Sequence, residues 1–181
     1  MSTRERRLVA AVVGGASEPL EILEAAEQLG AGLVAAGLRV ATGGLGGIMT
    51  TTSRGASQAP GWFDGAVIGV LPGLDARQGN PFLDVVIPSG LNFARNTVLV
   101  AMADVVIGIA GGAGTLSELA LAWQHGKPVV GLDMGRGWSA RLAGQSLDVR
   151  RDDIVHRATS VEEALELARS LAGSREPTRE F

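Results

Sequence analysis

At 181 residues, 46% of them hydrophobic and 19% charged, the chain has the length and composition of one folded domain rather than of a disordered segment or a coiled coil. A net charge of −3 without a basic stripe argues against a nucleic-acid partner, and the absence of cysteine excludes disulfides, cysteine zinc sites and thiol nucleophiles. No apolar run has the roughly 18 residues of a membrane helix or the features of a signal peptide, so we expect a cytoplasmic protein without a membrane partner.

Short apolar runs alternate with helical patterns in the first half of the chain. Continuous apolar runs of strand length are typical of strands buried on both faces, whereas apolar residues at helical spacing predict amphipathic helices. Ser17 is the expected N-cap of the first helix. In chain order, the pattern predicts a strand at 8–13, a helix at 18–36, a strand at 39–42, a helix at 50–58 and a strand at 66–71.

The alternation continues to the end of the chain. It predicts a strand at 84–87, a helix at 89–102, a strand at 105–109, a helix at 116–125, strands at 129–132 and 154–156, and a helix at 160–171. A glycine-broken loop is expected at 133–138. Such alternation favours right-handed βαβ units. We therefore predict an α/β fold, a single doubly wound Rossmann-like domain with a mostly parallel sheet over 1–172, followed by a flexible tail over 173–181.

Three glycine-rich loops, at 14–17, 43–47 and 111–115, each follow a predicted strand and precede a predicted helix. Glycine lets a ligand approach the backbone, and a helix N-terminus offers unpaired N–H groups to an anion. Three equivalent loops at the carboxyl edge of a sheet favour phosphate binding over packing alone. The expected ligand-binding residues are Gly15, Ser17, Gly43, Gly44, Gly46, Gly47, Asn92, Gly111, Gly112, Gly114 and Thr115; for Asn92, as for Asn96, helix capping and solvation stay open as alternatives.

The common nucleotide-binding motifs do not fit these loops. A P-loop needs Gly-Lys-Ser/Thr, and the single lysine of the chain, Lys127, lies in none of them. The dinucleotide motif needs a third glycine where the sequence has Met49 and Ser117. Binding of NAD and hydrolysis of ATP are therefore disfavoured.

The segment Gly111-Gly112-Ala113-Gly114-Thr115-Leu116-Ser117-Glu118 resembles the GGxGTxxE motif of the Lonely Guy (LOG) proteins, which are phosphoribohydrolases. The loop 43–49 is similar to that family's earlier glycine loop, and Arg95 falls 23 residues before Glu118, where the family has its catalytic arginine. The resemblance covers about 8–132. It implies a homodimer that releases the base from a purine nucleoside 5′-monophosphate, with Arg95 and Glu118 as catalytic residues.

Four positions depart from the hydrolase pattern. Ala110 replaces a proline, Ser117 a glutamate, Asn96 a lysine and Phe93 a histidine. The segments 80–82, 90–96 and 135–138 look closer to a sister branch that includes the molybdenum-cofactor carrier proteins. That branch implies an alternative function, a non-catalytic carrier or sensor of a phosphorylated ligand such as molybdenum cofactor.

The two functions assign different roles to the same residues. In a hydrolase, Glu118 would stabilise an oxocarbenium-like transition state, and Arg95 would hold the phosphate or Glu118 itself. In a carrier, the two residues would form a structural ion pair. We expect no metal and no resident cofactor, with molybdenum cofactor as a bound ligand in the alternative. Pyridoxal phosphate is disfavoured because Lys127 is predicted at the opposite end of the sheet from the glycine loops.

Overall fold

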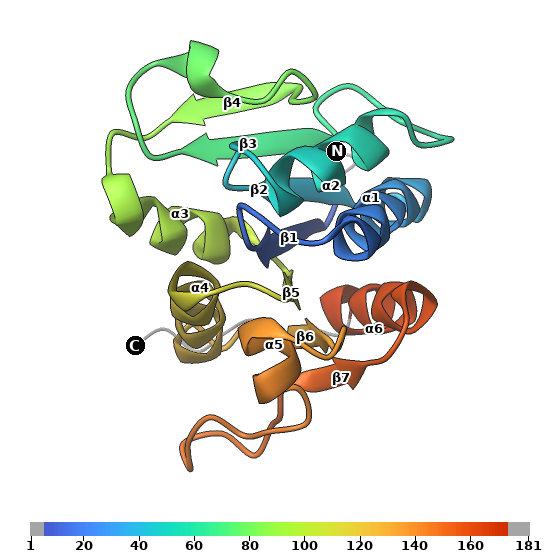
Figure 1. The fold of residues 1–181 in the computed structure, drawn as a ribbon, viewed down its shortest axis with the longest axis vertical. Helices are drawn as coiled ribbons and strands as arrows, with labels where there is room; N and C mark the ends of the chain where they lie inside the picture. The colour runs from blue at the N-terminus through green and yellow to red at the C-terminus, as the bar shows by residue number, and fades with distance from the viewer. Residues whose placement is uncertain (1–5, 174–181) are drawn as a thin grey trace, which may run out of the picture.

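The computed structural model describes residues 6–173 as one seven-stranded sheet flanked by helices (Figure 1). The strands are β1 (Val9–Gly14), β2 (Arg39–Thr42), β3 (Val67–Leu71), β4 (Val85–Pro88), β5 (Val105–Ile109), β6 (Val129–Leu132) and β7 (His156–Ala158). The α-helices are α1 (Leu20–Ala35), α2 (Ile48–Ser57), α3 (Arg95–Met102), α4 (Ala113–Gln124), α5 (Gly137–Leu142) and α6 (Val161–Gly173), and two short 3₁₀ helices are η1 (Ala76–Gln78) and η2 (Asn92–Ala94). Within residues 6–173, no helix has the length and apolar character needed to cross a bilayer.

The strand order is β4-β3-β2-β1-β5-β6-β7, and every pairing in this sheet is parallel. The chain winds outward from β1 to β4 and then returns to place β5 on the other side of β1. The point where the winding reverses therefore lies between β1 and β5. In such sheets the crevice beyond the carboxyl ends of these two strands is the usual ligand site. The predicted Rossmann-like α/β class is confirmed.

Helices cover both faces of the sheet, so the central strands are buried on both sides. Alternate residues of β1 enter different cores: Val12 packs with α1, α2 and α6, and Val13 packs with α3 and α4. The two groups of helices lie on opposite sides of the sheet (Figure 1). This double burial explains why β1, β3, β5 and β6 are continuous apolar runs rather than alternating ones.

Helices α1 and α2 pack so closely that glycine is required at their crossing. A Cβ atom at Gly55 would collide with the backbone oxygen of Glu27, and one at Gly30 would collide with that of Thr52. The guanidinium of Arg54 donates two hydrogen bonds to the Glu27 carboxylate, at 2.7 and 2.6 Å. This ion pair is a second contact between α1 and α2, the helix that follows the glycine loop at 43–47.

The structure differs from the predicted elements at several places. The helix predicted at 89–102 begins only at Arg95, because Asn92 before it has a left-handed backbone with a φ of 50°, and α4 begins at Ala113 rather than at 116. The first helix begins at Leu20 with Pro19 as its N-cap, because Pro19 has an extended backbone, and Ser17 makes no capping bond there. The last strand is His156–Ala158 rather than 154–156. Part of the loop predicted at 133–138 belongs to α5, whose first turn donates backbone hydrogen bonds to Ala110 and Gly111 across the sheet edge. Of the tail predicted at 173–181, residues 174–181 lie outside the described residues.

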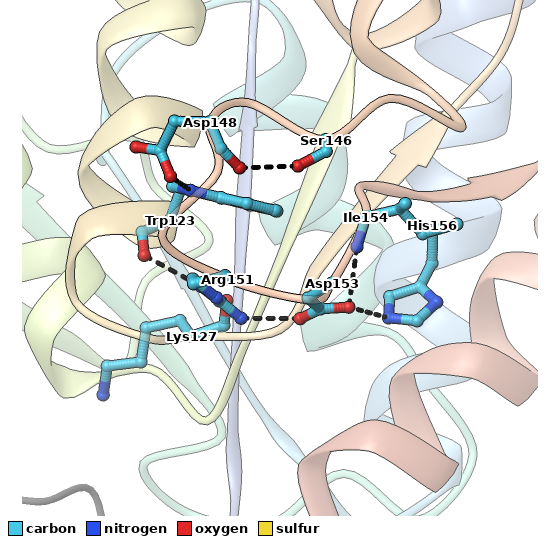
Figure 2. A network of polar contacts seen from close by, with 8 residues as sticks. All are labelled: Trp123, Lys127, Ser146, Asp148, Arg151, Asp153, Ile154 and His156. Carbon is cyan, nitrogen blue, oxygen red and sulfur yellow. Dashed lines mark hydrogen bonds and ion pairs between the residues drawn. The ribbon is translucent and has the colours of Figure 1, made fainter.

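A polar network at the opposite edge of the sheet holds the segment before β7 against the end of α4 (Figure 2). Arg151 donates to the backbone oxygen of Trp123 at 2.8 Å and to the Asp153 carboxylate at 2.6 Å. The indole N–H of the buried Trp123 donates to Asp148 at 3.2 Å, and His156 lies 3.4 Å from Asp153. Because these groups lie at the amino ends of β6 and β7, they stabilise the fold away from the glycine loops.

Candidate functional site

A cavity of about 210 Å³ opens at the carboxyl end of β1, at the reversal point between β1 and β5. Its walls come from the ends of β1 and β2 and from the first turns of α2, α3 and α4. The lining residues are Val12, Val13, Gly14, Gly15, Ala16, Gly43, Met49, Phe93, Arg95, Asn96, Gly112, Gly114, Thr115 and Glu118. Segments more than 100 residues apart in the sequence therefore build one site.

The N-termini of three helices meet at this cavity. Helices α2 and α4 have glycine N-caps, Gly47 and Gly112, so no side chain caps their first turns. The backbone N–H groups of 113–115 have no hydrogen-bond acceptor within the described part of the chain. Uncapped N–H groups and the positive ends of helix dipoles attract an anion. The geometry suits a phosphate group.

Glycine keeps this part of the cavity open. A Cβ atom built at Gly112 or at Gly114 would meet nothing within 4 Å, so the space beside both residues is available to a ligand. At Gly43, by contrast, a Cβ atom would collide with the guanidinium of Arg95 and the sulfur of Met49. Gly43 therefore allows Arg95 to lie flat against the end of β2.

Arg95 and Glu118 form an ion pair in the wall of the cavity. Nη1 of Arg95 donates to Oε1 of Glu118 at 3.2 Å, and the two side chains are only 13% and 7% exposed. Burial raises the pKa of Glu118 to about 7, and the nearby Arg95 guanidinium lowers it only in part. Near neutral pH the cavity therefore holds a carboxyl group that exchanges its proton readily.

Asn96 lies beside this pair and is 4% exposed. Its Oδ1 is buried without a hydrogen-bond partner, and no described residue bonds to either end of its carboxamide. Buried amides are normally paired, so an unpaired amide in a cavity wall calls for an explanation.

The structure brings Arg95, Glu118 and five of the predicted ligand residues, namely Gly15, Gly43, Gly112, Gly114 and Thr115, into the cavity lining. Among the described residues, the other predicted positions surround the cavity without lining it: Ser17, Gly44, Gly46, Gly47, Asn92 and Gly111. Gly47 packs against the backbone of Ala16 with a φ of 62°, and Gly44 packs against Leu71. Their roles as ligand contacts stay predictions, whereas their role in shaping the loops is visible.

Glu18 was missed by sequence reasoning. Its Oε1 accepts a hydrogen bond from the backbone N–H of Gly111 at 3.2 Å, and its Oε2 lies 3.5 Å from Nε of Arg136. A Cβ atom at Gly15 would collide with the same carboxylate. Glu18 therefore ties the loop after β1 to the loops after β5 and β6. Nothing in the local sequence indicates these contacts, because they join residues 93 and 118 positions apart.

Lys127 lies far from the cavity, as expected from the sequence. It follows α4 and precedes β6, at the amino ends of the strands, and Nζ donates to the backbone oxygens of Ala101 and Ala103 at 2.8 and 2.7 Å. Its contacts are those of a buried structural lysine.

Both the sequence and the structure of this chain are similar to those of known proteins. Residues 7–165 match the SLOG cluster4 family. The structure is similar to the structural-genomics target TM1055, with 37% sequence identity and a TM-score of 0.79 over 88% of this chain and 97% of that one. It is also similar to the molybdenum cofactor binding protein of Rippkaea orientalis, with 34% sequence identity and a TM-score of 0.79 over 92% of this chain and 98% of that one. A third similar structure is the Moco carrier protein of Chlamydomonas reinhardtii, with 32% sequence identity and a TM-score of 0.77 over 92% of this chain and 98% of that one. The chain belongs to the SLOG cluster4 family, in agreement with the LOG-like sister branch that the sequence resembles.

Proposed function

We propose that the protein binds a phosphorylated pterin-type ligand, of the molybdenum-cofactor class, and carries it without cleaving it. The observation that supports this proposal most is the cavity between β1 and β5, where the uncapped first turn of α4 faces space kept open by Gly112 and Gly114. The phosphate would lie against the N–H groups of 113–115. The similarity to proteins named as molybdenum-cofactor binders and carriers supports the class of ligand.

Glu118 favours a carrier over a hydrolase. A phosphoribohydrolase needs a carboxylate to face positive charge that develops on the sugar. Here burial raises the pKa of Glu118 to about 7, so near neutral pH part of the protein holds a neutral carboxyl group at this position. When Glu118 is ionised, Arg95 at 3.2 Å already balances its charge.

Phosphoribohydrolase activity remains the second candidate, because Arg95 and Glu118 both line the cavity next to the proposed phosphate position. A carboxyl group with a pKa near 7 can also exchange protons during bond cleavage. One experiment separates the two candidates. The protein is incubated with AMP, GMP and molybdenum cofactor separately, and both retained ligand and free base are measured.

For a carrier, we expect molybdenum cofactor to stay with the protein through gel filtration and to be transferred to an apo-molybdoenzyme. Free adenine and guanine should stay at the level of the no-protein control. Release of base with multiple turnovers, abolished by Glu118→Gln, would establish the hydrolase instead. Failure to retain any phosphorylated ligand would refute the proposed site.

The proposal includes a cytoplasmic homodimer. The outward side of η2 and α3 carries small or apolar exposed residues, namely Ala94, Thr97, Val98 and Ala101, and the neighbouring Phe93 is 89% exposed. This face has no charged side chain, which suits a second copy of the chain. Val98→Glu should convert a dimer into a monomer in sedimentation experiments, and an unchanged sedimentation coefficient would refute this interface.

A further inference from the structure

The unpaired amide of Asn96 is the starting point for a further inference about the ligand. Its Oδ1 is buried without a hydrogen-bond partner, its Nδ2 makes no hydrogen bond to another of residues 6–173, and the residue as a whole is only 4% exposed. With both ends unpaired, rotation of the carboxamide can turn either the oxygen or the nitrogen toward the cavity. A buried amide of this kind is satisfied when a ligand brings the missing partner.

The neighbours of Asn96 narrow down that partner. Glu118 contributes a carboxyl group that accepts hydrogen bonds when ionised, and Arg95 contributes only donors. Arg95 uses one of its five N–H groups in the bond to Glu118. The cavity wall at Asn96 and Glu118 thus presents two side chains with acceptor oxygens beside a cation, whereas the first turn of α4 presents backbone donors.

A fully ionised phosphate cannot satisfy the acceptors, because it carries no hydrogen-bond donor. A ring edge with adjacent N–H donors and a carbonyl acceptor can satisfy all three side chains. The 2-amino-4-oxopyrimidine edge shared by pterins and guanine has this pattern. Adenine does not, because its corresponding edge has one amino donor and a ring-nitrogen acceptor.

We propose that Asn96 and Glu118 bind the 2-amino-4-oxopyrimidine edge of the ligand and select it over an adenine-type ring, while Arg95 donates to its carbonyl oxygen. This inference rests on the proposed function, since it places the ring beside Asn96 and Glu118 in the same cavity where the N-terminus of α4 holds the phosphate. Asn96 is then a specificity-determining residue, because its amide pairs with the ring edge that adenine lacks.

The test compares the affinities of four probes that share a phosphorylated sugar: GMP, IMP, AMP and ribose 5-phosphate. The guanine of GMP has two adjacent donors, a ring N–H and an amino group, whereas the hypoxanthine of IMP lacks the amino group. The adenine of AMP has a ring-nitrogen acceptor in place of the ring N–H donor, and ribose 5-phosphate has no base. We expect GMP to bind about ten-fold or more tighter than AMP, with IMP between them, as in sites built to pair with a substrate donor. Calorimetric titration measures each affinity.

Two variants connect this preference to Asn96. Asn96→Leu keeps the side-chain volume but removes the amide, so the preference for GMP over AMP should disappear. The same variant should raise the melting temperature of the ligand-free protein, because a buried unpaired amide is removed. Gln28→Met is the matched control: it removes a side-chain amide at similar volume from an exposed position of α1, and it should leave both preference and melting temperature unchanged.

The affinities of the four probes separate a failure of this inference from a failure of the phosphate site. Equal binding of GMP and AMP, or a GMP preference that survives Asn96→Leu, would overturn the inference while leaving the phosphate site intact. If ribose 5-phosphate accounted for all of the affinity that depends on Asn96, the amide would bind the sugar, and the inference would be wrong. If none of the four probes bound, the phosphate site of the proposed function would have failed, and the inference with it.

Discussion

Nη1 of Arg95 lies 3.2 Å from Oε1 of Glu118, and this ion pair joins the first turns of α3 and α4 within the wall of one cavity. The pair places a buried carboxyl group next to the uncapped N-terminus of α4. A phosphate bound there would lie close to Glu118, so the protonation of this residue and ligand binding should influence each other.

The raised pKa of Glu118 predicts that part of the protein's stability is lost between pH 4.5 and 7. In this range the folded protein holds a proton on Glu118 that the unfolded chain has released, so the free energy of unfolding falls as pH rises. A shift from 4.5 to about 7 corresponds to about 3 kcal/mol. Glu118→Gln removes this contribution, so its stability relative to the wild type should increase by up to that amount between pH 4.5 and 8.

Urea unfolding at a series of pH values measures this difference. Glu162→Gln, at an exposed position of α6, controls for the general loss of one acidic side chain. Parallel stability curves for Glu118→Gln and the wild type would show that burial does not raise the pKa of Glu118 as described.

Gly114→Ala should raise stability and weaken ligand binding at the same time. Gly114 lies in the first turn of α4 without a positive φ, so alanine should stabilise the helix by up to about 1 kcal/mol. The new methyl group would fill space that we assign to the phosphate. Loss of charge-assisted hydrogen bonds of this kind costs about 1.5–3 kcal/mol, roughly 10- to 100-fold in affinity.

Gly173→Ala at the end of α6 is the matched control, since a Cβ atom there also meets open space but lies far from the cavity in sequence and fold. It should leave ligand affinity unchanged. Thermal melts and titration with a phosphorylated ligand measure the two effects. If Gly114→Ala bound the ligand as tightly as the wild type, the assignment of the phosphate to this position would be wrong.

Ala110→Pro should unfold the glycine loop after β5, although the hydrolases have proline here. Ala110 has a φ of 47°, which proline cannot adopt because its ring fixes φ near −65°. We expect a loss of about 3 kcal/mol or more in the free energy of unfolding. Ala110→Gly, which accepts this φ but loses a buried methyl group, should stay within about 1 kcal/mol of the wild type. A proline variant as stable as the wild type would show that the loop can adopt the hydrolase conformation.

Lys127→Met should lower the melting temperature without changing ligand affinity. The substitution removes the ammonium that bridges the backbone oxygens of Ala101 and Ala103, at the end of the strands opposite the cavity. Thermal melts and ligand titration measure the two effects.

Because Lys127 is held by these backbone oxygens, pyridoxal phosphate should form no aldimine on it in the folded protein. Absorbance spectra before and after borohydride treatment, with peptide mapping, test this; a trapped adduct on Lys127 would contradict the assignment.

The sequence was sufficient to predict the sheet, and it singled out Arg95 and Glu118, which line the cavity and whose functional roles stay predictions. Apolar runs such as 105–109 have strand length and no helical period, and the spacing of Arg95 and Glu118 agrees with a known motif. Glu18 and Asn96 could not be assigned in this way. Their significance depends on contacts and burial that arise only when loops distant in sequence meet. Likewise, α5 forms where a loop was predicted, because its first turn is held by Ala110 and Gly111 of another loop.

The proposed function depends on a ligand phosphate that binds at the N-terminus of α4, in the cavity between β1 and β5. A crystal structure of the protein with bound molybdenum cofactor tests it most directly. We predict that the phosphate oxygens lie within hydrogen-bonding distance of the backbone N–H groups of 113–115, with the ring toward Asn96 and Glu118. A phosphate held elsewhere on the protein, with this cavity empty or closed by side chains, would contradict the claim.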